Sequence, residues 1–148
     1  MKIEKIPRFL YSEEFPNDYG IHVITNKFKD FFYHRHEFYE FEYILEGEIT
    51  CVTNGVKYHM KKGDLAFITP LDLHSYEAVS DADVKTITVH FNADNLSSDF
   101  FSLAQMPSFI MKCDSELATA FETIEKENRI EDMRYLSLKN ILERILTL

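Results

Sequence analysis

Hydrophobic and polar residues alternate over most of the first two thirds of the chain. From about residue 38 to residue 91, short runs rich in Val, Ile, Tyr and Phe are separated by polar segments. Asn54-Gly55 lies between two of these runs, where Asn-Gly strongly favours a two-residue β-hairpin turn. Short strands with turn signals about every eight to twelve residues are typical of a small antiparallel barrel or sandwich. The pattern therefore predicts a mainly β fold.

A helical period replaces this alternation towards the C-terminus. Asp114 or Ser115 is predicted to cap a first helix, whose apolar stripe consists of Leu117, Phe121 and Ile124. The short apolar segment between residues 107 and 113 is predicted to be one more strand before this helix. The order of elements is thus strands first and two helices last.

The second predicted helix begins at about Asp132 and has a broad apolar face. At about 100° per residue this face spans an arc of about 160°, wide enough to pack on its own domain and on a partner helix together. We predict that it forms a homodimer interface through Leu138, Ile141, Leu142 and Ile145. No glycine, proline or polar cap follows the last residue, and helices usually end with such a signal. We therefore expect the native chain to continue beyond residue 148, with a plain C-terminal helix as the alternative.

The stretch from His34 to Gly47 concentrates polar chemistry in an apolar setting. On one continuous strand His34, His36 and Glu40 share a face, because successive side chains point to opposite sides. Polar groups on a largely apolar strand cost free energy to bury unless they bind something. We therefore predict that a polar ligand or a metal ion binds on this face, with Glu42 as a second carboxylate or a rim residue.

Three further features bear on a binding site. Thr86, Thr88 and His90 alternate on one face, which either points into a pocket or is the solvent-exposed face of an edge strand. The aromatic patch of residues 28–33 is predicted to belong to the core, or else to line the mouth of a pocket. Cys51 is predicted to be a small buried hydrophobic residue.

Composition and charge narrow the classes of function. With 148 residues, 45% of them hydrophobic, the chain can form one domain with a substantial core. The formal net charge is −9 and no cluster of Lys and Arg stands out, so this stretch alone is not expected to bind DNA. Two cysteines without a CxxC spacing suit a reducing compartment, and no segment has the character of a membrane span or a signal peptide. The sequence predicts a soluble, cytoplasmic protein.

Two spaced motifs add a family resemblance. His34-x-His36-x3-Glu40-x6-Gly47 resembles the first motif of the cupin superfamily, and Gly63-Asp64-x5-Pro70-x3-His74 resembles its second motif in the form found in sugar-sensing regulators. In metal-binding cupins the matching positions hold the metal; in this chain they are His34, His36, Glu40 and His74. Three imidazoles and a carboxylate suit Zn, Fe, Ni or Mn.

The chain also departs from the metal-binding pattern. Phe28 stands where the first motif usually has a glycine, and Leu71-Asp72 replaces the usual glycine after Pro70. No Asn follows His74 at the expected place. The resemblance therefore leaves two readings open, a divalent metal site and a metal-free pocket.

The match continues over nearly the whole chain, through residues 34–40, 45–47, 63–70, 74–76 and 88–91 and the two-helix tail. This combination resembles the N-terminal domain of AraC-family transcriptional regulators. The resemblance implies a cupin barrel with an N-terminal arm over residues 1–113, a helical dimerisation segment over 114–148, and a helix-turn-helix DNA-binding domain beyond 148. It also implies that a small effector, often a sugar, binds in the barrel, with contacts from His34, His36, Glu40, His74, Tyr76 and Thr88.

We therefore predict a non-enzymatic sensor that binds a small polar effector, carbohydrate-like, and forms a homodimer. It would reach DNA only through the domain beyond residue 148, and it would have no membrane contact. A metal-dependent small cupin enzyme, of the dioxygenase or sugar isomerase type, is the alternative, with the four metal-competent residues around an open metal site. A carbohydrate-binding module without a regulatory role is the third interpretation.

Overall fold

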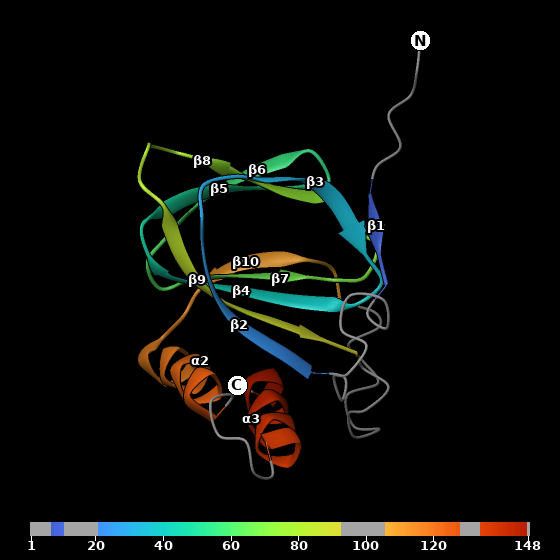
Figure 1. Cartoon of the computed structure of the whole chain (residues 1–148), viewed down its shortest axis with the longest axis vertical. Helices are drawn as coiled ribbons and strands as arrows, with labels where there is room; N and C mark the ends of the chain where they lie inside the picture. Colours follow the sequence, from blue (N-terminus) through green and yellow to red (C-terminus); the bar gives the residue numbers. More distant parts are fainter. Residues whose placement is uncertain (1–6, 11–20, 93–105, 128–133, 148) are drawn as a thin grey trace.

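The computed structural model describes residues 7–10, 21–92, 106–127 and 134–147. In these ranges the strands form two five-stranded sheets, stacked as two layers (Figure 1). The first sheet has the order β1-β3-β8-β5-β6. Its strands are β1 (Arg8–Phe9), β3 (Phe31–His36), β8 (His74–Ala78), β5 (Glu48–Thr53) and β6 (Val56–Lys61).

The second sheet has the order β10-β7-β4-β9-β2. Its strands are β10 (Phe109–Lys112), β7 (Asp64–Ile68), β4 (Tyr39–Glu46), β9 (Val84–Phe91) and β2 (Ile21–Phe28). The described strand pairs are antiparallel, apart from the parallel pair of β1 and β3. Asn54 and Gly55, both with positive φ, make the predicted hairpin turn between β5 and β6. The predicted mainly β, antiparallel fold is confirmed.

Two helices, α2 (Ser115–Glu127) and α3 (Arg134–Thr147), cover the outer face of the second sheet (Figure 1). The start of α2 is as predicted, because the Asp114 carboxylate accepts a hydrogen bond of 2.9 Å from the Leu117 backbone N–H. The start predicted for the second helix, Asp132, lies outside the described residues. Neither described helix has the length and apolar character needed to cross a membrane.

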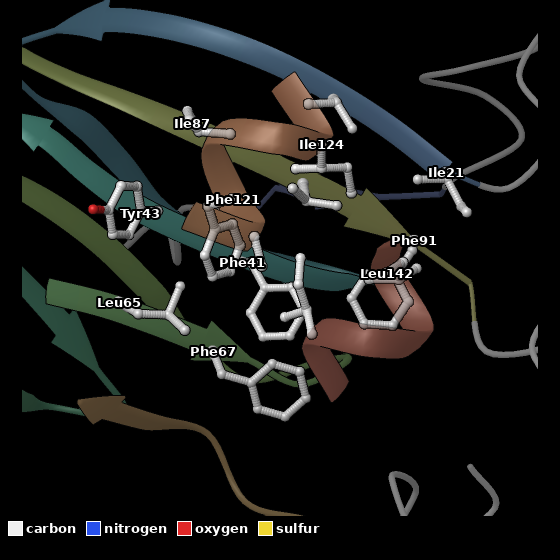
Figure 2. Close-up of a cluster of buried hydrophobic side chains, with 14 of the residues drawn as sticks. Ile21, Phe41, Tyr43, Leu65, Phe67, Ile87, Phe91, Phe121, Ile124 and Leu142 are labelled. Atoms are coloured by element: carbon white, nitrogen blue, oxygen red, sulfur yellow. The ribbon is translucent and has the colours of Figure 1, made fainter. Parts of the chain in front are cut away.

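The larger hydrophobic core lies between the second sheet and the helices (Figure 2). Phe121 of α2 stacks on the ring of Tyr43 at a centroid distance of 5.2 Å and meets Phe41 edge-on at 5.5 Å. Leu117 and Ile124, the rest of the predicted stripe, are buried in the same cluster. The amphipathic pattern of α2 is therefore explained by packing on β4 and its neighbours.

The residues predicted to form the dimer interface have partners in their own chain. Leu142 and Ile145 are buried in the core beneath α3, and Ile141 is half-buried at its edge. Leu138 lies in α3, but its side chain is outside the described part. The homodimer itself stays a prediction.

A smaller core fills the space between the two sheets. It includes Ile44 from β4, Cys51 from β5 and Ala66 from β7. Cys51 is fully buried, as predicted. Strand β4 therefore buries both faces: its odd-numbered side chains from Tyr39 to Tyr43 face the helices, and its even-numbered side chains face the interior.

The stretch from His34 to Gly47 is two strands, which corrects the prediction of one. β3 ends at His36, Glu37 and Phe38 form a bend, and β4 begins at Tyr39 in the other sheet. Because the bend takes two residues, the alternation of inward and outward positions continues unchanged across it. The sequence pattern therefore could not show the break, although it correctly placed His34, His36 and Glu40 on one face.

Candidate ligand-binding site

A cavity of about 250 Å³ opens between the two sheets. Its polar lining consists of Asn26, Lys27, His34, His36, Glu40, Glu42, Tyr76, Thr88 and His90. Its apolar wall is aromatic and includes Phe9, Phe28, Phe31 and Phe38. The cavity thus offers hydrogen-bonding groups on one part of its surface and ring faces on another.

Glu40 is the centre of the polar wall. One carboxylate oxygen, Oε2, lies 2.9 Å from His90 Nε2 and 3.1 Å from His36 Nε2. The other, Oε1, accepts a hydrogen bond of 2.7 Å from the hydroxyl of Tyr76. His74 Nε2 lies 3.9 Å from Oε2, a distance that suits ion pairing rather than a hydrogen bond. A carboxylate that is only 4% exposed is thereby surrounded by partners from β3, β8 and β9.

Three histidines of this cluster are oriented by the backbone. His34, His36 and His74 each place Nδ1 within 2.9 Å of a backbone carbonyl oxygen. A carbonyl only accepts, so Nδ1 must donate, and in a neutral ring Nε2 then presents a lone pair. Metal-binding histidines are commonly held in this way, by a hydrogen bond at the other ring nitrogen.

Burial and neighbouring charges set the protonation of the cluster. Burial, reinforced by the charge of His74, lowers the pKa of His34 to about 4. Burial also lowers the pKa of His36. For His74 burial acts in the same direction, but the carboxylate of Glu40 outweighs it and the pKa is raised. Burial would raise the pKa of Glu40, but the histidines around it hold that pKa well below its usual range. Near neutral pH the site therefore has an ionised Glu40 facing neutral rings of His34 and His36.

The four predicted metal ligands have the positions that a metal site needs. Ligand atoms from His34, His36, Glu40 and His74 all lie within 4.8 Å of one another, and all four side chains are buried. His36 Nε2 and Glu40 Oε2 both present lone pairs and lie 3.1 Å apart. Two such acceptors attract each other only when a proton or a cation lies between them. The residues therefore fit a divalent metal ion.

A second polar group lies further along β4. Thr88 donates a hydrogen bond of 2.8 Å to Glu42 Oε1 and accepts one of 2.9 Å from the Asn26 side-chain amide. Burial and the neighbouring carboxylate of Glu40 raise the pKa of Glu42 well above its usual value. Two carboxyl groups thus share one face of β4 but have different environments.

The mouth of the cavity is aromatic. Phe31 lies 4.7 Å from the ring of His34 and 4.7 Å from Phe32, between ring centroids. Phe31 and Phe32 are 40% and 53% exposed, so neither belongs to the core, and Phe31 lines the cavity. Phe9 of β1 closes the same side, 5.7 Å from His34, because β1 pairs with β3.

The structure brings the predicted ligand-binding residues together. His34, His36, Glu40, Tyr76 and Thr88 line the cavity. His74 packs behind them, with its ring 4.2 Å from that of His34, and is not part of the cavity wall. That these residues bind a ligand stays a prediction.

Sequence reasoning missed part of the wall. His90 was named only as one of three polar residues on one face of a strand, and Asn26 and Phe9 were not predicted to be near the site. The signal for His90 is the register of β4 and β9, which places it directly opposite Glu40. Register depends on pairing between distant segments, so the sequence of β9 alone does not reveal it.

Comparison with known proteins gives these features a family context. The family described as AraC-like ligand binding domain matches residues 18–127. The HTH-type transcriptional activator RhaR of Pectobacterium atrosepticum is 32% identical over 70 residues, which are 47% of this chain and 25% of RhaR.

Solved structures of ToxT from Vibrio cholerae share the fold. An apo single-residue variant superposes with a TM-score of 0.67 at 11% identity, over 88% of this chain and 56% of ToxT. Wild-type ToxT with a bound unsaturated fatty acid gives a TM-score of 0.60 at 13% identity, over 88% of this chain and 53% of ToxT. This chain thus spans a quarter of RhaR and about half of ToxT. Because the family match covers most of the two sheets and the whole of α2, the chain belongs to the AraC-like ligand binding domain family.

Proposed function

We propose that this domain is the non-enzymatic sensor of a cytoplasmic transcriptional regulator, and that it binds a small neutral sugar or polyol between its two sheets. The observation that carries the proposal is the cavity itself, with a hydrogen-bonding wall centred on Glu40 and an aromatic mouth centred on Phe31. Hydroxyl groups of a sugar can pair with the polar wall, while its C–H faces pack on the rings.

The size of the cavity supports a small effector. Its volume of about 250 Å³ lies just below the range of about 300–1,000 Å³ for pockets that hold drug-sized ligands. The similarity to RhaR supports the regulatory part of the proposal, because RhaR is an HTH-type transcriptional activator. In the full-length protein, DNA binding would belong to a domain beyond residue 148, and the net charge of −9 agrees with this division.

Isothermal titration calorimetry with neutral monosaccharides and polyols tests the proposal. An unsaturated fatty acid, the ligand class found in one ToxT structure, serves as the contrasting ligand. We expect at least one sugar or polyol to bind. Binding of the fatty acid alone would contradict the proposal.

A pair of tyrosine variants locates the site. Tyr76→Phe removes the hydroxyl that holds Glu40, and we expect about tenfold weaker binding of the sugar that binds best. Tyr58→Phe removes the same hydroxyl from a tyrosine that is 40% exposed on β6, and we expect no change. Equal effects of the two variants would place the ligand elsewhere.

The second candidate function is that of a metal-dependent enzyme, which the convergence of His34, His36, Glu40 and His74 specifically favours. These residues would hold the metal, through Nε2 of each histidine and the carboxylate. A metal bound there would supply Lewis-acid chemistry at an open coordination position. The orientation of the rings by backbone carbonyls supports such binding, as described above.

Metal analysis of protein purified without chelators or a histidine tag tests this candidate. A metal site predicts stoichiometric Fe, Mn, Ni or Zn that is lost in His36→Ala. His59→Ala, a change at an exposed histidine on β6, is the matched control and should keep the metal. Wild-type protein without metal would overturn the metal-dependent enzyme and leave the sensor.

A further inference from the structure

The loop between β7 and β8, residues 69–73, is held by hydrogen bonds to two other parts of the chain. The Leu71 N–H donates to the backbone carbonyl of His36 at 2.8 Å. The Leu73 N–H donates to the side-chain oxygen of Asn54 at 3.1 Å, and the Asn54 N–H donates to the Leu73 carbonyl at 2.7 Å. The loop is thus fastened both to the end of β3 and to the turn between β5 and β6.

One residue of this loop has a strained backbone. Leu71 has a φ of +69°, in the left-handed region that residues other than glycine rarely adopt. Its side chain is 47% exposed, so packing in the core does not hold it there. Strain of this kind persists only where surrounding contacts fix the backbone, and it is common at functional sites. The hydrogen bonds of the loop are such contacts.

Asp72 joins the loop to the binding site and to β10. Its carboxylate oxygen Oδ2 accepts a short hydrogen bond from the hydroxyl of Ser108 and one of 2.9 Å from the hydroxyl of Thr69. The Thr69 N–H donates to the Ser108 hydroxyl at 2.9 Å, which closes this network. On the other side, the Asp72 backbone carbonyl accepts a hydrogen bond of 2.9 Å from His74 Nδ1. The side chain therefore anchors the residue while its carbonyl holds the ring.

The orientation of His74 decides which atom it presents to the site. With Nδ1 held by the Asp72 carbonyl, Nε2 lies 3.9 Å from Glu40 Oε2. A ring turned over about its Cβ–Cγ bond would present a C–H group there instead. The ring is fully buried, and its centroid lies 4.2 Å from that of His34. A change in its orientation would therefore act directly on Glu40 and His34, which both line the cavity.

We propose that Asp72 is a positioning residue of the effector site. Its carboxylate, anchored by two hydroxyl groups, fixes the loop, and its carbonyl then orients the imidazole of His74 towards Glu40. Because Ser108 immediately precedes β10, and only two residues separate β10 from α2, the same anchor joins the site to the segment that leads into α2. The inference rests on the proposed function only in taking this site as the one that the effector occupies.

NMR of the histidine rings in isotope-labelled protein tests the inference without a ligand. In the wild type the Nδ1–H protons of His34, His36 and His74 should exchange slowly with water, since each buried ring donates to a backbone carbonyl. In Asp72→Ala we expect the His74 proton to exchange at least about tenfold faster, and the other two to stay unchanged. His34 and His36 are internal controls, because carbonyls outside the loop hold them.

Matched variants separate positioning from a loss of stability. Asp72→Asn keeps an acceptor oxygen for both hydroxyls and should behave like the wild type. Asp64→Ala removes a comparable turn contact, the hydrogen bond of 2.9 Å from the Lys61 N–H, and should leave all three protons unchanged.

Three results would overturn the inference. The first is a His74 proton that exchanges rapidly in the wild type, or equally slowly in Asp72→Ala. The second is an equal acceleration for all three histidines, since the variant would then only loosen the fold. The third is an effect of Asp72→Asn as large as that of Asp72→Ala, since the hydroxyl contacts would then not hold the loop.

Ser108→Ala covers the case in which Asp72→Ala does not fold. It removes one of the two hydroxyl donors, and we expect the His74 proton to exchange about threefold faster. Ser80→Ala is the matched control, because it removes a hydroxyl that accepts a hydrogen bond of 3.2 Å from the Ala82 N–H, and it should have no effect. In that case an unchanged exchange rate in Ser108→Ala would overturn the inference. Circular dichroism checks the fold of each variant.

Calorimetry with the neutral sugar or polyol that binds the wild type best extends the test to the function. We expect Asp72→Ala to bind it about tenfold more weakly and Asp64→Ala to bind it like the wild type. Unchanged affinity in Asp72→Ala would overturn the role of Asp72 in the effector site. If no neutral sugar or polyol binds the wild type, the proposed function fails, and the exchange rates still decide whether Asp72 positions His74.

Discussion

Gly47 follows β4 and has a positive φ, a backbone conformation that residues other than glycine rarely adopt. Its φ is +88°, and a Cβ added there would lie 3.0 Å from the carbonyl oxygen of Asp83 and 3.3 Å from Cα of Val84. We expect Gly47→Ala to lower the free energy of unfolding by about 2 kcal/mol or more, through backbone strain and this contact together. Urea denaturation followed by circular dichroism measures the change.

Gly55 provides the matched control for this prediction. Its φ of +82° is similar, but an added Cβ would meet nothing within 4 Å. Gly55→Ala should therefore show the conformational cost alone, about 1–2 kcal/mol. Equal losses in the two variants would show that the close approach of Asp83 has no effect on stability.

The two cysteines give a prediction about reactivity. Burial raises the pKa of both Cys51 and Cys113 to about 12, and for Cys113 the charges of Asp114 and Asp64 add to the effect. A raised pKa leaves less thiolate, which is the reactive form, so at pH 8 each thiol should have about a thousandfold less thiolate than a free one. We expect almost no reaction with Ellman's reagent in buffer and two rapid equivalents in urea.

The variant Cys51→Ser separates the two thiols. Cys51 is fully buried, whereas Cys113 is partly exposed. Any slow reaction of the native protein should therefore come from Cys113 and persist in this variant. Rapid modification of one thiol in the native wild type would contradict the prediction.

At the scale of elements, local signals predicted local structure well. The Asn54-Gly55 turn, the capping residue Asp114 and the stripe that contains Phe121 each act within a few residues of sequence. Each could therefore be predicted from the sequence alone, and so could the shared face of His34 and His36. His74 and Tyr76, by contrast, were predicted as site residues only through the family resemblance.

What could not be predicted depends on contacts between distant segments. The break between β3 and β4 assigns His36 and Glu40 to different sheets, and only the pairing of whole strands decides this. His90 faces Glu40 because of register, and Phe9 reaches the mouth because β1 adds to the edge of β3. A local sequence pattern carries no information about which distant strands pair or in which register.

The start of α2 gives a prediction at this scale. Asp114→Ala removes the hydrogen bond to the Leu117 N–H and should lower the free energy of unfolding by about 1 kcal/mol, as measured by urea denaturation. Asp114→Asn keeps an acceptor oxygen and should recover most of the loss. Asp81→Ala, a change at an exposed aspartate between β8 and β9, should have no effect. A loss in the asparagine variant as large as in the alanine variant would show that the charge matters and that the hydrogen bond does not.

For the molecule as a whole, one sheet lies between the cavity and the helices. β4 presents Glu40 and Glu42 to the cavity and packs Tyr43 against Phe121 of α2 on its other face. β2 repeats this arrangement: Asn26 contacts Thr88 at the cavity, and Thr25 donates a hydrogen bond of 3.2 Å to Glu125 of α2. Only the second sheet thus separates a change at the cavity wall from the helices. Such proximity gives a regulator a short physical connection between effector and helices, provided that the two states differ in these contacts.

The outward side of the helices is where the predicted homodimer must be tested. Ile141 is half-buried and borders a groove between α2 and α3, together with Ala120 and Arg144, whereas Leu142 is fully buried beneath α3. We expect Ile141→Glu to convert a dimer into a folded monomer, because a charge would be buried at the interface without a partner. Size-exclusion chromatography with light scattering gives the mass, and circular dichroism checks the fold. Leu142→Ala, by contrast, should destabilise the monomer by about 2–5 kcal/mol. A monomeric wild type, or an unchanged dimer mass in Ile141→Glu, would show that this helical surface does not mediate dimerisation.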